Sequence, residues 1–257
     1  MKNQSTFSGK AWKIGPEVQD FNELLERFID EKKLKKEEIS CFLSPKNTDL
    51  HDPYLMCGME TAVRRIQSAL KNRERIMIYG DFDTDGITST VVLVQGLRSL
   101  GGKVSYRIPS RENDSHGLKS YLLDEIHKKE VGLVITCDCG INDSFEVKHG
   151  TDLGMDIIVT DHHDPDPSRF PETATAVLNP LQEHCNYPCK TLSGVGVAFK
   201  IIQALFQETD KSLSPYLELT AIGQVADCVP LAGETRTMVA LGLEEMKQSA
   251  WPGLDLL

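Results

Sequence analysis

The sequence predicts an α/β domain with a mainly parallel sheet and flanking helices, preceded and followed by helical segments. Two observations support this prediction. Between residues 75 and 179, five short runs that are apolar on both faces alternate with amphipathic stretches. Such runs are typical of strands buried in a parallel sheet whose connections are crossover helices. Outside this region, apolar residues recur mainly three and four positions apart, which is helical spacing.

The first segment, residues 1–74, is expected to be a helical lead-in. The stretch VQDFNELLERFIDEKK places Phe21, Leu24 and Phe28 on one helix face, and METAVRRIQSALKN does the same with Ile66 and Leu70. A turn-rich link, LSPKNTDLHDPY, separates the two stretches. The basic run KKLKKEE is expected to be a solvated helix end rather than a surface for nucleic acid.

The central segment, residues 75–192, is the expected α/β core. Its predicted strands are RIMIY, KVSYRIP, VGLVITC, MDIIVT and TAVLN. Its predicted helices are GITSTVVLVQGLRSL, KSYLLDEIHKK and DSFEVKHGTDLG. The third segment, residues 193–257, returns to helical spacing in GVGVAFKIIQALF, PYLELTAIGQVADCV and TRTMVALGLEEMKQ. We expect this third segment to complete the same domain.

The composition limits the classes of protein to which the chain can belong. The 257 residues are 40% hydrophobic and 26% charged, as is usual for a globular chain, and the net charge is −10. An acidic chain argues mildly against nonspecific binding of polyanions, although carboxylates loaded with divalent cations make a site locally cationic. No apolar run is long enough to span a membrane, and the first residues lack the apolar core of a signal peptide. Seven cysteines, an odd number, indicate reduced thiols and a cytoplasmic location.

The stretch GDFDTDG follows the first predicted strand and carries carboxylates at alternate positions, Asp81, Asp83 and Asp85. A calcium-binding EF-hand loop begins in the same way, but it needs a glutamate at its twelfth position and a helix in front. Counted from Asp81, the twelfth residue is Val92, and the preceding segment is a predicted strand. The acidic triplet therefore needs another explanation.

Two later predicted strands also end in polar clusters, TCDCG and TDHHD. The carboxyl ends of parallel strands meet at one edge of a sheet. The side chains expected to converge there are Asp81, Asp83, Asp85, Asp138, Asp161, His162 and His163. Neighbouring carboxylates cannot all ionise cheaply unless cations lie between them, and this oxygen-rich set with histidine suits two Mn²⁺ or Mg²⁺ ions. A further acidic ligand is expected from Asp227, at the end of an apolar helix.

More ordinary explanations exist for single members of these patterns. Taken alone, Asp81 or Asp161 could be a helix N-cap, and the histidine pair could be structural. The stretch SGVGVAFK lacks the spacing of a dinucleotide fingerprint, so Gly194 and Gly196 serve either close packing or approach to a phosphate, and we favour packing. No cysteine pair has the C-x2-C spacing of zinc sites. We interpret the following residues as structural: Cys137, Cys139, His184, Cys185 and Cys189.

The motifs GDFDTDGITST, TCDCGI, TDHHDP, SGVGVAFK and VADCVPL resemble, in order and spacing, those of the DHH phosphoesterase superfamily. The resemblance is strongest to its RecJ branch, the 5′→3′ exonucleases specific for single-stranded DNA. It extends to FLSPKNTDLHDPYLMCGMETAVRRI, to the arginine-containing loop IPSRENDSHGL and to LNPLQEHCNYPCKTLSGVGVAFK, and so covers the chain from about residue 30 onward. This fold family is consistent with the α/β domain predicted above.

The resemblance also implies roles for individual residues. The implied ligands of the two ions are Asp83, Asp85, Asp138, His162 and Asp227, with Asp138 between the ions. Asp81 would be a further ligand or lie close to one, and Asp161 would orient the histidines. His163 would contact the scissile phosphate or protonate the leaving oxygen. Arg111 would clamp a phosphate oxygen, and a surface salt bridge is the alternative for this residue.

By the same resemblance, the chain is an exonuclease that releases 5′-mononucleotides from single-stranded DNA by two-metal hydrolysis, in DNA repair or recombination. The implied partners are single-stranded DNA and a single-strand-binding protein or a helicase, without a membrane. Two alternatives stay open. One is a DHH phosphoesterase acting on short oligonucleotides, cyclic dinucleotides or pyrophosphate. The other is a DHH module that binds without catalysis.

The chain departs from the RecJ pattern in two ways. RecJ proteins continue into a DHHA1-type domain and usually an OB-fold, and this sequence ends at Leu257 before either. The loop that is Gly-Tyr-Gly in the family is Ser115, His116 and Gly117 here. The expected metal site is intact, but the missing domain would supply part of the basic and stacking surface that binding of DNA requires.

Overall fold

The computed structural model describes residues 3–5, 11–13, 17–32 and 36–256. These residues fall into two compact units, 1–44 and 45–257. In the first unit, β1 (Asn3–Ser5) and β2 (Ala11–Lys13) pair antiparallel, and α1 (Phe21–Lys32) and α2 (Lys36–Leu43) follow. The helix predicted from VQDFNELLERFIDEKK is thus confirmed as α1.

The lead-in is not helical throughout, because β1 and β2 form strands. Three-residue strands are too short for an alternating pattern to show, so periodicity could not have indicated them. The basic run KKLKKEE cannot be compared with its prediction, since its side chains lie outside the described residues.

The second unit is built on a five-stranded sheet with the order β4-β3-β5-β6-β7, and every strand pair is parallel. The strands are β3 (Arg75–Gly80), β4 (Lys103–Arg107), β5 (Leu133–Cys137), β6 (Asp156–Thr160) and β7 (Ala176–Leu178). Each coincides with a predicted apolar run. The prediction of an α/β fold with a mainly parallel sheet is therefore confirmed.

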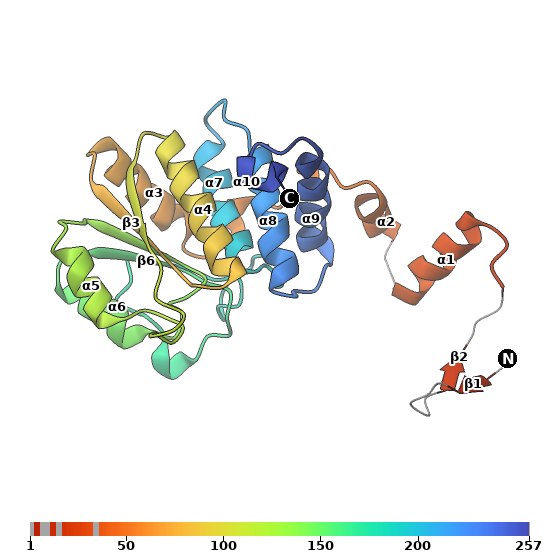
Figure 1. Ribbon diagram of the computed structural model, residues 1–257, viewed down its shortest axis with the longest axis horizontal. Helices are drawn as coiled ribbons and strands as arrows, with labels where there is room; N and C mark the ends of the chain where they lie inside the picture. Colours follow the sequence, from red (N-terminus) through yellow and green to blue (C-terminus); the bar gives the residue numbers. More distant parts are fainter. Residues whose placement is uncertain (1–2, 6–10, 14–16, 33–35, 257) are drawn as a thin grey trace. The chain divides into compact units, whose positions relative to one another are not determined.

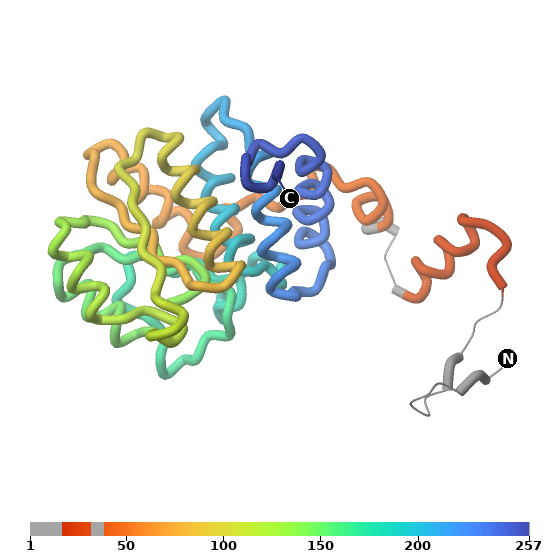
Figure 2. Tube along the Cα trace, in the orientation of Figure 1, coloured from red at the N-terminus to blue at the C-terminus, as the bar shows by residue number. Residues whose placement is uncertain are grey.

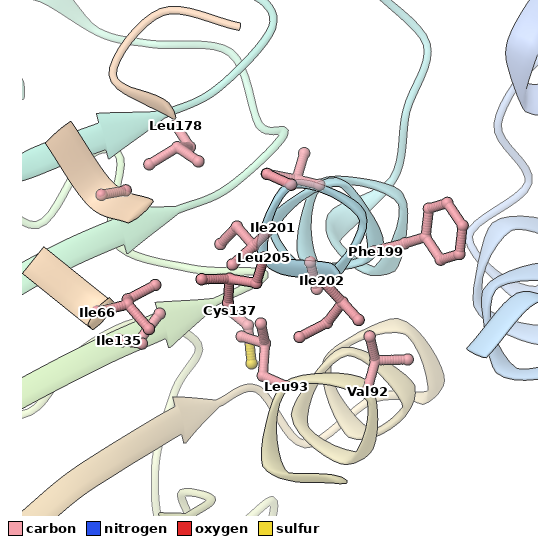
Figure 3. Packing of buried hydrophobic residues seen from close by; sticks show 14 of the residues in the cluster. Ile66, Val92, Leu93, Ile135, Cys137, Leu178, Phe199, Ile201, Ile202 and Leu205 are labelled. Atoms are coloured by element: carbon pink, nitrogen blue, oxygen red, sulfur yellow. The ribbon is translucent and has the colours of Figure 1, made fainter. Parts of the chain in front are cut away.

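Helices cover both faces of this sheet (Figure 1). One face carries α3 (Met59–Lys71), α4 (Thr84–Ser99) and α7 (Gly194–Phe206); the other carries α5 (Ser120–His127) and α6 (Ser144–Asp152). The larger core lies on the first face, where Ile66, Leu93 and Ile201 from the three helices surround Ile135 and the neighbouring strand residues (Figure 3). A smaller cluster fills the second face. Coverage on both sides explains why the strands are apolar on both faces.

The last helices, α8 (Ser214–Ala226), α9 (Gly233–Glu245) and α10 (Pro252–Asp255), gather beside α4 and α7 rather than on the sheet (Figure 2). Short 3₁₀ turns occur at η1 (Asn47–Asp49), η2 (Pro53–Leu55), η3 (Pro167–Arg169) and η4 (Met246–Gln248). No helix in the described ranges is long and apolar enough to cross a membrane. A functional division of the chain at residues 74 and 192 stays a prediction.

A buried ion pair ties the helices to the link before α3. The side chain of Lys200 on α7 is 0% exposed, and its Nζ lies 2.8 Å from Glu234 Oε1 on α9. The same ammonium donates to the carbonyl of His51 (2.6 Å), and Tyr187 Oη donates to Glu234 Oε2 (2.6 Å). Burial lowers the pKa of Lys200, so the ammonium depends on these partners for its charged state.

Candidate metal centre

Three neighbouring strands deliver aspartates to one edge of the sheet. Asp81, Asp138 and Asp161 each follow directly after β3, β5 and β6, and each is only 1 to 2% exposed. Asp138 has a φ of 63°, in the left-handed region, which aspartate tolerates better than most residues because its short polar side chain can bond locally. The strand edge therefore concentrates three carboxylates in a buried place, as the sequence predicted.

The N-terminus of α7 holds a fourth carboxylate, that of Asp85. Asp85 accepts hydrogen bonds from Ser193 Oγ (2.9 Å), the Gly194 N–H (2.6 Å) and the Val195 N–H (3.0 Å). These donors are among the groups that a helix start leaves without partners, and the helix dipole favours an anion there. Burial still raises the pKa of Asp85, although these bonds and His162 oppose the shift. Ser193 and the start of α7 were not predicted to support the site.

His162 lies at the centre of the cluster. Its Nε2 is 3.1 Å from Asp138 Oδ1, 3.7 Å from Asp227 Oδ2 and 3.8 Å from Asp85 Oδ2. Potential ligand atoms within 4.8 Å of one another form two groups that share His162: one with Asp138 and His163, the other with Asp85 and Asp227. The structure thus brings together five of the predicted site residues, which follow β5 and β6 or lie at the start of α4 and the end of α8.

Two buried atoms of this cluster indicate what it is built to hold. Asp138 Oδ1 and His162 Nε2 are both buried and lie 3.1 Å apart, but they do not form a hydrogen bond with each other or with any other described atom. Polar atoms left unsatisfied in a protein interior are costly, and metal coordination is one way in which they are satisfied. A divalent cation between a carboxylate and a neutral imidazole would satisfy both atoms, so the residues fit the metal that the sequence predicts.

The electrostatics of the site support the same interpretation. Burial and the charges of Asp85 and Asp161 raise the pKa of Asp138 to about 11. Burial also raises the pKa of Asp227, which caps the end of α8. Without a cation, the cluster can hold its carboxylates ionised at neutral pH only at a large cost, and divalent ions would remove that cost.

Asp161 has a different role, because both of its carboxylate oxygens already have hydrogen-bond partners within the chain. It accepts hydrogen bonds from the Ile141 N–H (3.0 Å) and the His162 N–H (2.7 Å), and His163 Nδ1 lies 2.6 Å from its Oδ1. Burial would raise the pKa of Asp161, but the hydrogen bond and charge of His163 lower it overall. In return, Asp161 raises the pKa of His163 to about 9. This geometry is that of a carboxylate that positions both histidines.

The remaining two members of the acidic triplet lie outside both ligand groups. Asp81 Oδ2 is 2.5 Å from Nδ1 of His116, and Asp83 is the N-cap of α4, accepting from the Gly86 N–H (2.8 Å). An N-cap was the ordinary explanation considered for Asp81 and Asp161, but in the structure Asp83 is the aspartate that caps a helix. Ligand roles for Asp81 and Asp83 stay predictions. In the sequence, His116 stood out only because it replaces the tyrosine of the family's Gly-Tyr-Gly loop. No sequence pattern indicated that its side chain reaches Asp81.

Arg111 lies in an exposed loop beside the site. Its guanidinium carbon is 6.0 Å from the ring centroid of Phe82, whose ring lies 4.3 Å from that of His116. Across the described residues Arg111 forms no ion pair, so the salt-bridge alternative finds no support. A cavity of about 180 Å³ opens nearby, lined by Asp81, His116, Asp138, Asp161 and His163 among others. The role of Arg111 in binding a phosphate stays a prediction.

Gly194 and the cysteines match their structural interpretations. A Cβ on Gly194 would lie 2.6 Å from Asp138 Cβ, and one on Gly196 would lie 3.1 Å from Leu192 Cβ, so both glycines permit close packing. All seven cysteines are free thiols, and burial raises the pKa of Cys137 and Cys139. Neither metal-ligand group found among the described residues contains a cysteine.

Comparison with proteins of known sequence identifies relatives over this region. The protein named single-stranded-DNA-specific exonuclease RecJ from Bacillus subtilis (strain 168) is 42% identical over 221 residues, which are 86% of this chain and 28% of that protein. The protein of the same name from Escherichia coli (strain K12) is 37% identical over 216 residues, 79% of this chain and 37% of its own. The chain thus spans about a third of the length of these relatives.

Solved structures agree. An exonuclease RecJ bound to manganese superposes with a TM-score of 0.71 at 35% identity, covering 78% of this chain and 51% of that one. RecJ from Thermus thermophilus in complex with Mn²⁺ gives a TM-score of 0.68 at 30% identity, covering 89% of this chain and 34% of that one. The sequence pattern of the DHH family, N-terminal domain, matches residues 75–224, which is more than half of the chain. The chain therefore belongs to the DHH family.

Proposed function

We propose that the chain is the catalytic part of a metal-dependent 5′→3′ exonuclease that releases 5′-mononucleotides from single-stranded DNA. The observation that carries the proposal is the unsatisfied pair Asp138 Oδ1 and His162 Nε2, at the junction of two ligand groups. The names of the RecJ relatives supply the substrate, and the manganese and magnesium in three RecJ structures supply the class of metal. A role in repair or recombination rests on the same relatives.

Two divalent ions, Mn²⁺ or Mg²⁺, would be held by the members of the two ligand groups other than His163, which is kept for proton donation. His162 would contribute to the site between them, with Asp138 on one side and Asp85 and Asp227 on the other. Asp81, directly after β3, and Asp83, the N-cap of α4, would complete the coordination. When bound, such ions activate water as a nucleophile and stabilise the charge that develops on the phosphate.

The chain's own residues would do the remaining work. His163 is protonated at neutral pH because Asp161 holds its Nδ1, so it can donate a proton or a hydrogen bond to the leaving oxygen. Arg111 lies in a loop beside the site, and its guanidinium would bind a phosphate oxygen in bidentate fashion.

The test is degradation of single-stranded DNA labelled at its 3′ end, with Mn²⁺ and with an Asp138→Ala variant as the control. We expect stepwise loss of mononucleotides from the 5′ end by the wild type and none by the variant. Duplex DNA and single-stranded RNA run in parallel. If duplex DNA is degraded as fast as single-stranded DNA, or if the variant retains activity, the proposal is wrong.

A small phosphoester is the second candidate substrate. The cavity of about 180 Å³ beside the site is smaller than the roughly 300–1,000 Å³ usual for pockets that hold ligands of drug size, which favours a small phosphoester. Turnover of pyrophosphate, cyclic dinucleotides or dinucleotides, without cleavage of DNA, would favour this candidate. Metal binding without turnover of any substrate would favour a non-catalytic module. A cytoplasmic location and a single-strand-binding protein or helicase as partner stay predictions.

A further inference from the structure

The side chain of His116 contacts Asp81 beside the metal centre. Its Nδ1 lies 2.5 Å from Asp81 Oδ2, and the side chain of Asp81 is only 3% exposed. The other carboxylate oxygen, Oδ1, accepts a hydrogen bond from the Phe82 N–H (2.7 Å). An ionised carboxylate can only accept hydrogen bonds, so the imidazole Nδ1 carries a proton and donates it. Both oxygens of Asp81 are therefore held by donors of the chain.

The loop that carries His116 is held in place on both sides of this residue. The ammonium of Lys119 donates to Ser115 Oγ (2.9 Å) and to the carbonyl of His116 itself (2.8 Å). The N–H of Leu118 donates to Asp143 Oδ2 (2.8 Å), which ties the loop to the segment that precedes α6. The backbone of His116 is thus fixed by bonds that do not involve its imidazole, and the ring is presented to Asp81 from a set position.

The ring of Phe82 limits the rotation of the imidazole. The two ring centroids lie 4.3 Å apart, and the ring planes are tilted by 42°. Contacts of this kind between aromatic rings are favourable in addition to the area that they bury. Phe82 therefore supports Asp81 twice, because its N–H bonds one carboxylate oxygen and its ring packs against the donor to the other.

A surface ion pair is the ordinary explanation for an exposed histidine beside an aspartate, and such pairs contribute little to stability. Two observations argue against this explanation here. The acceptor is buried, and it lines the cavity of about 180 Å³ together with Asp138 and His163. Burial is the main cause of the raised pKa of Asp138, and the charge of Asp81 adds to it, so Asp81 lies within electrostatic reach of the ligand groups.

We propose that His116 is a positioning residue, which orients the carboxylate of Asp81 toward a divalent cation. A carboxylate has about four acceptor sites on its two oxygens, so the two hydrogen bonds to Asp81 leave lone pairs for a metal. Carboxylates that bind metals are commonly hydrogen-bonded in this way, which fixes their orientation. The family's tyrosine has its hydroxyl at the far end of the ring, so the Nδ1 contact belongs to this chain. The role rests on the proposed function, in which Asp81 is a ligand.

The test is isothermal titration of the whole chain with Mn²⁺, comparing two substitutions of His116. His116→Phe keeps a ring against Phe82 but has no donor, whereas His116→Asn keeps an N–H donor near the place of Nδ1 but has no ring. We expect His116→Phe to weaken Mn²⁺ binding about tenfold, and His116→Asn to stay within about threefold of the wild type. His127→Asn, at an exposed position on α5, is the matched control and should leave the affinity unchanged. Thermal unfolding checks that all variants are folded.

A double-mutant cycle shows whether His116 acts through Asp81. If it does, Asp81→Asn/His116→Phe should bind Mn²⁺ no more weakly than Asp81→Asn alone. A further loss in the double variant would overturn the proposal, as would equal losses in His116→Phe and His116→Asn. Unchanged or tighter binding by His116→Phe would also overturn it, and so would an Asp81→Asn protein that binds Mn²⁺ like the wild type.

These titrations contain no DNA, so their outcome is separate from that of the nuclease assay. The expected order of Mn²⁺ affinities in a chain that cleaves no DNA would leave the role of His116 standing and overturn the exonuclease alone. DNA cleavage together with an unchanged affinity in His116→Phe would do the reverse.

Discussion

At the level of single residues, Asp138 carries a large electrostatic cost. Its raised pKa means that, without metal, the folded state favours a protonated carboxyl, so ionisation at pH 7 costs stability. Asp138→Asn removes that cost, and we expect the metal-free variant to be more stable than the wild type by about 1–3 kcal/mol. With Mn²⁺ at about a thousand times its Kd, the wild type alone should gain about 4.1 kcal/mol.

The order of stability should therefore reverse when Mn²⁺ is added. Urea unfolding of both proteins with EDTA and with Mn²⁺ measures it. If the asparagine variant gains as much from Mn²⁺ as the wild type, Asp138 is not a ligand.

The pair of His163 and Asp161 predicts a pH dependence of stability. The folded-state pKa of His163 is raised from 6.5 to about 9. The contribution of its charge to the free energy of unfolding is therefore fully present below pH 6.5 and is lost as the pH rises through 9. In metal-free protein, the free energy of unfolding of the wild type should fall over this window more than that of His163→Gln. Urea unfolding at pH 6, 7.5 and 9 gives the two slopes. His127→Gln, at an exposed position on α5, should follow the wild type, and parallel curves for His163→Gln would contradict the prediction.

At the level of elements, the site depends on how closely the start of α7 approaches the end of β5. Gly194 makes this approach possible, because a side chain there would overlap Asp138 Cβ and Oδ1, at 2.6 and 2.7 Å. We expect Gly194→Ala to cost about 1–3 kcal/mol of stability and to weaken Mn²⁺ binding, since one of the two elements must shift. Gly253→Ala is the control, because a Cβ on that glycine would meet no described atom within 4 Å and the residue lies in a helix.

Isothermal titration with Mn²⁺ and thermal unfolding of both glycine variants measure these effects. We expect Gly253→Ala to stay within about 1 kcal/mol of the wild type, since alanine is the better helix former. Unchanged Mn²⁺ affinity in a folded Gly194→Ala protein would show that the contact between α7 and β5 is not needed by the site.

Elements with a strong periodic pattern were predictable, and elements without one were not. Strands β3, β5, β6 and β7 could be found because both faces of the sheet are covered there, which makes each an apolar run, whereas β4 is only partly buried. The convergence of Asp138, Asp161 and His162 followed from the rule that parallel strands end at one edge. The hairpin of β1 and β2 is too short to show a pattern. The contact of Asp85 with Ser193 joins residues 108 positions apart, and no local pattern encodes it.

At the level of the whole molecule, the ion pair of Lys200 and Glu234 joins three parts of the second unit. Both side chains are fully buried, and breaking a buried pair leaves an uncompensated charge. We expect Lys200→Met to lower the free energy of unfolding by about 3–5 kcal/mol. The double variant Lys200→Met/Glu234→Gln should recover part of this loss, because glutamine carries no charge, keeps an acceptor for the His51 N–H and has an NH2 group that can donate to Tyr187 Oη.

Urea denaturation of the wild type and of the single and double variants gives the coupling energy between the two residues. Additive effects in this cycle would mean that the pair does not act as a unit. The sequence did not predict this network, because its partners come from residues 51, 187, 200 and 234, which share no pattern in the sequence. The sheet could be predicted without it, from the apolar runs alone.

The bonds from the start of α7 to Asp85 also bear on how the protein is made. During synthesis the chain leaves the ribosome with Asp85 long before Ser193, Gly194 and Val195, and Asp227 emerges later still. When only the first strands have left the ribosome, their carboxylates can come together, but the α7 groups that hydrogen-bond Asp85 are not yet available. Tight capture of manganese should therefore begin only when α8 has emerged, so the metal would bind after the sheet has formed rather than guide its formation.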